Sequence, residues 1–205
     1  MNLDPFYLIV DNADWLARLL PCGVKFVQLR LKDLPDDALR AHISKARELC
    51  LLHGAQLVVN DYWRLAIELG CDFIHLGQED LLAADIVAIR KAGVRLGIST
   101  HDDSELSRGL EAYPDYVALG PVFPTILKEM PWAPQGLDRV ADWKSRLMGV
   151  PLVGIGGLNI QRGIDVLRAG ADSVAVVTDI SLNADPEART KAWVEATRPF
   201  AAVRD

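Results

Sequence analysis

The sequence has little cysteine, no long apolar run and no excess of positive charge. Its 205 residues include three cysteines, Cys22, Cys50 and Cys71, which stand far apart and form no C-x-x-C pair. This spacing argues against a zinc knuckle or a thioredoxin-like motif, and sparse cysteines favour reduced thiols in a cytoplasmic protein. No apolar run approaches the ~18 residues of a membrane span. No basic stretch precedes the first apolar run, so we expect no secretory signal.

The formal net charge is −6, and 50% of the residues are hydrophobic. A negative total argues against a nucleic-acid-binding face, although it leaves room for a local basic pocket. The apolar half suffices for a sizeable core, and the 24% of charged residues is far from the composition of a disordered chain. Composition is even along the chain, which predicts one domain over residues 1–205. The sequence leaves open whether the chain forms a homo-oligomer.

Short apolar runs alternate with amphipathic stretches of helical periodicity. The runs predict strands at Phe6–Val10, Lys25–Leu29, Gln56–Val59, Phe73–Leu76, Arg95–Ser99, Tyr116–Leu119, Leu152–Ile155 and Ser173–Val177. The clearest helices are predicted at Asp36–Leu52, Asp85–Ala92, Asp103–Leu110, Gln161–Ala169 and Asp185–Ala202. Alternating strands and helices form parallel units, so this α/β pattern predicts a single-domain (β/α)8 TIM barrel. An open, doubly wound sheet is the alternative, because periodicity does not show closure.

Active sites of such barrels lie at the carboxyl ends of the strands, where this sequence carries unusual polar residues. Gln28, Arg30 and Lys32 alternate after the second strand, which fits a phosphate site or a strand end in solvent. Asp61 and Asp80 follow the next two strands. One or two carboxylates with substrate phosphates are a typical magnesium site. The alternative is that Asp61 caps a helix and Asp80 lies in a turn.

The fifth predicted strand is followed by Ser99 and His101. Ser99 fits either a substrate contact or a cap for the next helix. Isolated histidines such as His75 and His101 are more often structural residues than catalytic bases. The sequence shows no serine–histidine–acid arrangement of the kind that supports nucleophilic catalysis.

A second phosphate site is indicated across the barrel. The long segment Gly120–Gly136 offers Thr125 and Lys128, a hydroxyl and a cation, or Lys128 is simply an exposed loop lysine. The seventh strand runs into Gly156 and Gly157, where glycine lets backbone N–H groups approach an anion. Two anion sites and a magnesium site at one barrel mouth suggest an enzyme that joins, or acts on, two phosphorylated small molecules.

Eight short segments, taken in their order along the chain, form a recognisable pattern. They are Gln28 to Lys32, Asn60 to Ala66, His75 to Asp80, Gly97 to His101, Ala118 to Thr125, Ala133 to Leu137, Ile155 to Gly157, and Ala175 to Val177. Any one of these segments is a weak signal, whereas all of them in order are a specific one. With these segments, the sequence resembles the thiamine phosphate synthase family over nearly the whole chain.

The resemblance implies a (β/α)8 transferase of thiamine biosynthesis. Such an enzyme couples 4-amino-2-methyl-5-hydroxymethylpyrimidine diphosphate to a thiazole phosphate, giving thiamine monophosphate and pyrophosphate. The resemblance implies Mg²⁺ as the cofactor with Asp61 and Asp80 as ligands, and small molecules, not nucleic acid or membrane, as partners. By the same resemblance, Lys128, Arg30 and Ser99 are the catalytic residues. The substrate-binding residues that it implies are Gln28, Leu29, Arg30, Leu31, Lys32, Asn60, Ser99 and Lys128 for the diphosphate, and Thr125, Ile126, Leu127, Gly157, Val177 and Thr178 for the thiazole phosphate.

Two positions depart from the family pattern, both on the thiazole side. Leu127 replaces a usual threonine, and one lost neutral hydrogen bond costs about 0.5–1.5 kcal/mol. Asp179 adds a negative charge that would oppose a phosphate if it faces the site. Two alternatives remain. One is a related barrel such as a thiazole tautomerase, against which Asp61, Asp80 and Lys32 argue. The other is a non-catalytic, ligand-binding relative.

Overall fold

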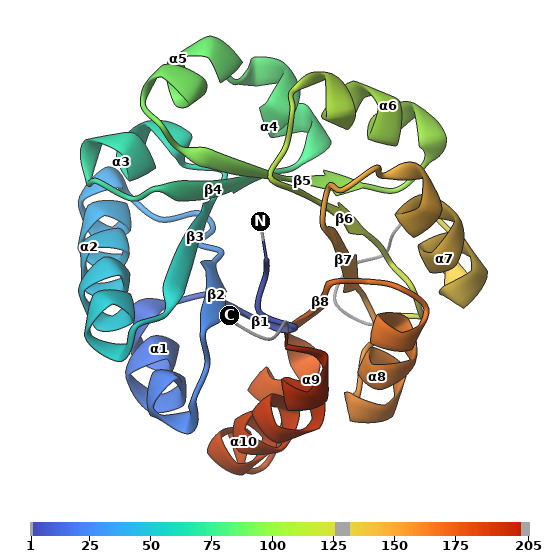
Figure 1. The fold of residues 1–205 in the computed structure, drawn as a ribbon. Helices are drawn as coiled ribbons and strands as arrows, with labels where there is room; N and C mark the ends of the chain where they lie inside the picture. The colour runs from blue at the N-terminus through green and yellow to red at the C-terminus, as the bar shows by residue number, and fades with distance from the viewer. Residues whose placement is uncertain (1, 126–131, 202–205) are drawn as a thin grey trace.

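Eight parallel strands close into a barrel in the order β1 to β8 (Figure 1). The computed structural model describes residues 2–125 and 132–201. Closure occurs between β1 and β8, where Phe6 pairs with Val174 and Leu8 with Val176. This confirms the (β/α)8 barrel over the open sheet. The strands are β1 (Phe6–Val10), β2 (Phe26–Leu29), β3 (Gln56–Asn60), β4 (Phe73–Leu76), β5 (Arg95–Thr100), β6 (Tyr116–Leu119), β7 (Leu152–Ile155) and β8 (Ser173–Val176).

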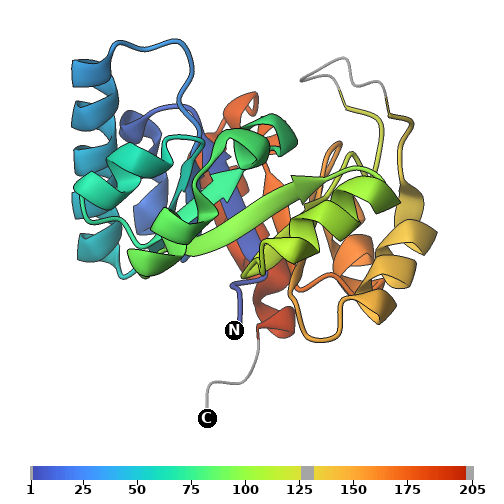
Figure 2. The same ribbon diagram turned by 90° about the horizontal axis from the view of Figure 1, so that it is seen from above.

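The helices surround the barrel, as Figures 1 and 2 show. None of those in the described part of the chain is long and apolar enough to cross a membrane. They are α1 (Ala13–Leu19), α2 (Asp36–His53), α3 (Trp63–Glu68), α4 (Gln78–Ala83), α5 (Ile86–Lys91), α6 (Asp103–Glu111), α7 (Gly136–Arg146), α8 (Ile160–Arg168), α9 (Thr178–Ser181) and α10 (Pro186–Thr197), with 3₁₀ turns at Leu20–Cys22 and Arg198–Phe200.

The structure corrects two predicted boundaries near the C-terminus. The last helix ends at Thr197 and not at Ala202, because Pro199 lies in the following 3₁₀ turn and proline disfavours continuation of a helix. The last strand ends at Val176, so Val177 is the residue that precedes α9. The start of α10 agrees with the prediction, since the Asp185 side chain accepts the backbone N–H of Ala188.

Each strand buries both of its faces, which explains its continuous apolar sequence. In β1, Phe6, Leu8 and Val10 pack in the layer between the barrel and the helices. Tyr7 and Ile9 alternate with them and belong to a separate cluster inside the barrel. Because both clusters exclude water, the strands show no polar alternation.

Four aromatic rings fill the inside of the barrel. Tyr7 stacks on Phe26 with ring centroids 3.9 Å apart, and Tyr116 meets Phe73 edge-on at 5.6 Å. The Tyr116 ring lies directly over Gly97 of β5, so a Cβ atom at Gly97 would collide with the ring. A glycine at this position therefore makes room for the central ring of the barrel interior.

We expect Gly97→Ala to lower the free energy of unfolding by about 1–3 kcal/mol, because the new methyl group overpacks a filled core. Urea denaturation measures the change. Gly109→Ala is the matched control, since its Cβ would lie 3.4 Å from Ile98 in ordinary contact and alanine suits a helix. Equal stability of the Gly97→Ala protein and the wild type would contradict the packing described for Tyr116.

Candidate active site

The segment after β2 carries the first group of polar residues at the barrel mouth. Gln28 points into the barrel and is buried, whereas Arg30 and Lys32 lie beyond the end of the strand and are exposed. Arg30 is close enough to Asp61 to lower the pKa of that carboxyl group. Leu29 and Leu31 pack in the core outside the barrel, so their predicted contact with substrate could come only from the backbone.

Asp61 and Asp80 lie together at the ends of β3 and β4, as the sequence predicts. Burial raises the pKa of Asp61 to about 6, with further contributions from the charge of Asp80 and a hydrogen bond shared with it. The amide of Asn60 donates to Asp61 over 2.5 Å. Asp61 does not cap α3, because the residue at the N-cap position is Tyr62. Among the described residues, no side chain caps the start of this helix. Asp80 lies in the first turn of α4.

The carboxylate pair fits a divalent cation that is shared with a substrate. Two carboxylates that repel each other gain from a cation between them, and oxygen ligands suit Mg²⁺. The described residues contain no group of three or more histidine, cysteine or acidic side chains arranged to hold a metal ion. Mg²⁺ typically takes one or two carboxylates and completes its shell with water and phosphate oxygens, so two side chains suffice.

Ser99 lies at the end of β5 and is bound to His75 of β4. Nε2 of His75 is 2.8 Å from the Ser99 hydroxyl, and the Gln78 amide donates to the Ser99 carbonyl over 2.7 Å. Ser99 does not cap α6, because the Asp102 side chain does so. Burial lowers the pKa of His75 to about 3, so the ring is neutral at physiological pH. His75 is thus a buried structural residue, as the sequence favours.

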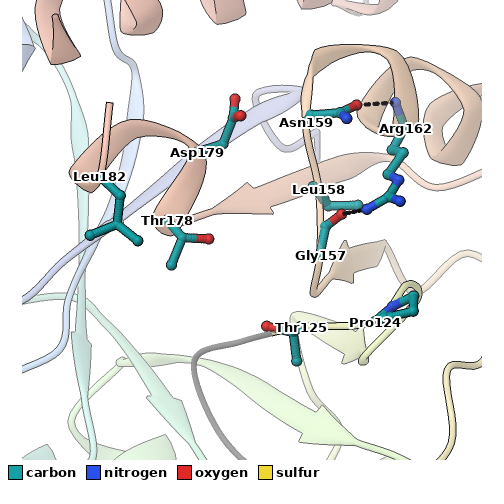
Figure 3. Close-up of a pocket in the computed structure, with 9 residues that line it drawn as sticks. All are labelled: Pro124, Thr125, Gly157, Leu158, Asn159, Arg162, Thr178, Asp179 and Leu182. Atoms are coloured by element: carbon teal, nitrogen blue, oxygen red, sulfur yellow. Dashed lines mark hydrogen bonds between the residues drawn. The ribbon is translucent and has the colours of Figure 1, made fainter. Parts of the chain in front are cut away.

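A cavity of about 230 Å³ opens between the ends of β6, β7 and β8 (Figure 3). Thr125, Gly157 and Thr178 line it, three residues that the family resemblance implies as contacts of the thiazole phosphate. Gly157 has a φ of +65°, and a Cβ atom there would collide with the Pro124 carbonyl. Only glycine therefore lets these two segments approach so closely. The predicted site residues Ile126, Leu127 and Lys128 lie outside the described residues.

The carboxylate of Asp179 is bound by residues of α10. Arg189 donates to it through two nitrogens over 2.8 and 3.1 Å, and the indole of Trp193 donates over 2.7 Å. Although Asp179 lines the cavity, its charge is compensated by Arg189. The negative charge of Asp179, which departs from the family pattern, therefore repels a bound phosphate less than the sequence suggests.

Arg162 is a cavity residue that the sequence reasoning missed. Its guanidinium donates to the Gly157 carbonyl over 2.7 Å and lies 4.9 Å from the centre of the Phe123 ring. Figure 3 shows it bent back from α8 toward Gly157. The available signal was a cation five residues after a glycine pair at a strand end, in the first turn of the following helix. In this structure the first turn of α8 lies at the barrel mouth, so the Arg162 side chain reaches the cavity.

Fold and site together define a (β/α)8 barrel enzyme with an acidic pair and a cavity of about 230 Å³ at one mouth. Residues 6–180 match the family model described as thiamine monophosphate synthase. The thiamine-phosphate synthase of Rhizobium etli is 64% identical over 203 residues, covering 99% of this chain and 100% of that protein. That of Citrobacter koseri is 46% identical, covering 96% of this chain and 90% of that protein.

A solved structure supports the same fold. The thiamine phosphate pyrophosphorylase from Pyrococcus furiosus superposes with a TM-score of 0.85 at 23% identity, covering 96% of each chain. The chain belongs to the thiamine monophosphate synthase family, whose members named above are transferases of thiamine biosynthesis.

We expect Asp80→Asn to lower the pKa of Asp61 in the metal-free protein. The substitution removes the repelling charge, while burial, the larger cause, keeps the pKa above its ordinary value. A carboxyl-carbon NMR titration measures it. An unchanged pKa would show that the two carboxyl groups do not interact.

Proposed function

We propose that this chain is a magnesium-dependent thiamine-phosphate synthase. It couples 4-amino-2-methyl-5-hydroxymethylpyrimidine diphosphate to a thiazole phosphate and releases pyrophosphate. The observation that carries the proposal is the juxtaposition of Asp61, Asp80 and Arg30 at the barrel mouth, in a chain 64% identical to a protein named for this activity. The three free cysteines suit the cytoplasmic location that the sequence predicts.

The first step is cleavage of the bond between the pyrimidine methylene carbon and the diphosphate oxygen. The electron pair leaves with pyrophosphate, and the aminopyrimidine ring stabilises the resulting carbocation. Arg30 and Lys32, with Lys128 from the segment after β6, stabilise the negative charge on the leaving group. Asp61 and Asp80 would hold the Mg²⁺, which supplies further charge neutralisation to the departing phosphates.

The second step is attack of the thiazole nitrogen on the carbocation, which forms the new C–N bond. The cavity at Thr125, Gly157 and Thr178 would hold the thiazole phosphate, and Val177 directly precedes Thr178 in the chain. Arg162 adds a cation on the same wall. Holding the nitrogen close to the carbocation is an orientation effect, and it requires no general base. The low pKa of His75 agrees with this, because a group with a pKa of about 3 is a poor base.

We expect Asp61→Asn to abolish magnesium-dependent formation of thiamine monophosphate, because the cation loses a charged ligand. A coupling assay with both substrates and a magnesium titration measures it. Asp142→Asn is the matched control, since the Asp142 carboxylate pairs with Arg146 on the exposed surface of α7. Saturable binding of both substrates without turnover in the wild type would instead favour the non-catalytic relative. Conversion of a thiazole alone would favour the tautomerase.

We expect Arg162→Ala to raise the KM for the thiazole phosphate about tenfold, the scale of one charge-assisted hydrogen bond. The KM for the pyrimidine diphosphate should stay unchanged. Arg168→Ala is the control on the same helix, because Arg168 is exposed and forms a surface ion pair with Asp165 over 3.7 Å. Steady-state kinetics with each substrate varied separately measures both constants. An equal effect on both substrates would contradict the placement of the thiazole phosphate at this cavity.

A further inference from the structure

A continuous chain of hydrogen bonds crosses the inside of the barrel from β2 to β5, beneath the mouth. The Gln28 amide donates to the Tyr7 hydroxyl over 2.9 Å, and the hydroxyls of Tyr7 and Tyr116 are 2.9 Å apart. Nδ1 of His75 lies 2.7 Å from the Tyr116 hydroxyl, and its Nε2 lies 2.8 Å from Ser99 Oγ. The first four side chains are at most 6% exposed, and Ser99 is partly exposed at the mouth.

Proton counting gives this chain a direction. Each hydroxyl has one proton, and Nε2 of Gln28 can only donate. Tyr7 accepts from Gln28 and donates its own proton to Tyr116, which donates in turn to Nδ1 of His75. If Tyr116 donated to Tyr7 instead, the Tyr7 proton would be buried with no acceptor among the described residues, which is unfavourable.

The direction determines the tautomer of His75. A neutral imidazole carries one proton, and its nitrogen Nδ1 already accepts from Tyr116. The proton is therefore on Nε2 and is donated to Ser99 Oγ. The Ser99 oxygen accepts this hydrogen bond through one of its lone pairs. The hydroxyl proton of Ser99 therefore remains available for another acceptor. The packing of Tyr116 over Gly97 holds the middle of the chain in place.

We infer that the chain presents Ser99 to the mouth as a hydrogen-bond donor, with His75, Tyr116 and Tyr7 as positioning residues. The inference rests on the proposed function and on the family resemblance, which implies that Ser99 contacts the pyrimidine diphosphate. It names the chemistry of that contact. The partner is an acceptor atom, a ring nitrogen or a phosphate oxygen. If the Gln28 amide were rotated by half a turn, its oxygen would face Tyr7 and every hydrogen bond from Tyr7 to Ser99 would reverse direction. Ser99 would then donate its proton to His75, offer only lone pairs to the mouth and repel an acceptor atom of the substrate.

The first experiment is nitrogen-15 NMR of the histidine rings in the substrate-free protein. The protein has four histidines. The set of ring signals that is lost in a His75→Gln protein therefore belongs to His75. We expect an unprotonated Nδ1 and a protonated Nε2. A protonated Nδ1, a doubly protonated ring or an average of both tautomers would overturn the inference. If the His75→Gln protein does not fold, through-space NMR contacts between the His75 ring and the Tyr116 ring, whose centroids are 5.5 Å apart, assign the same signals in the wild type.

The second experiment compares Tyr116→Phe with Tyr113→Phe. Removing the Tyr116 hydroxyl leaves Nδ1 without a donor, so both tautomers of His75 should appear. The kcat/KM for the pyrimidine diphosphate should fall about threefold to tenfold, the scale of one hydrogen bond. The KM for the thiazole phosphate should stay unchanged. Tyr113 is 83% exposed and should alter neither the spectrum nor the kinetics.

The outcomes separate this inference from the proposed function. If His75 shows the single Nε2–H tautomer but the protein forms no thiamine monophosphate, the proposed function is overturned. The direction of the hydrogen bonds from Gln28 to Ser99 then still holds. An active enzyme with a protonated Nδ1 would overturn only the inference. In the active enzyme, unchanged kinetics of Tyr116→Phe, or equal losses for both substrates, would show that Tyr116 does not act through Ser99. Ser99→Ala, whose small side chain fits the same space, provides the second variant if Tyr116→Phe does not fold.

Discussion

The packing of aromatic rings inside the barrel is the constraint on which the other features depend. Tyr7, Phe26, Phe73 and Tyr116 fill a closed space that water cannot enter. Two of these rings carry hydroxyl groups, and a buried hydroxyl requires a partner. Gln28 is the partner of Tyr7, and His75 is the partner of Tyr116. The other ring nitrogen of His75 is hydrogen-bonded to Ser99 at the mouth. The apolar core and the polar mouth are therefore parts of one arrangement.

The mouth divides into two regions of different chemistry. On the side of β2 to β5, the Asp61 carboxyl group lies close to both Asp80 and Arg30, an arrangement suited to a cation and a diphosphate. On the side of β6 to β8, Thr125, Gly157 and Thr178 line a cavity of about 230 Å³. The charge of Asp179 on this side is compensated from α10. The net charge of −6 thus conceals a mouth where cations and acids are paired locally.

Most of the fold could be predicted because the strands are buried on both faces. The predicted bounds of Phe6–Val10, Phe73–Leu76, Tyr116–Leu119 and Leu152–Ile155 agree with the structure. A helix was predicted after each strand, but no bounds were predicted for α1, α3, α4, α7 and α9. In α3 and α4, six residues each are too few to show a 3.6-residue period. The proximity of Asp61 and Asp80 could be predicted as well, because adjacent parallel strands end at the same edge of a barrel.

By itself, the sequence determines the alternation of strands and helices, the segments that resemble the family, and which polar residues follow each strand. The tertiary structure alone decides which polar groups meet. Tyr7 and Tyr116 are 109 residues apart and come together only through barrel closure. Asp179 is paired with Arg189 because α10 packs against α9. Contacts of this kind depend on closure and helix packing, which no local pattern of residues records.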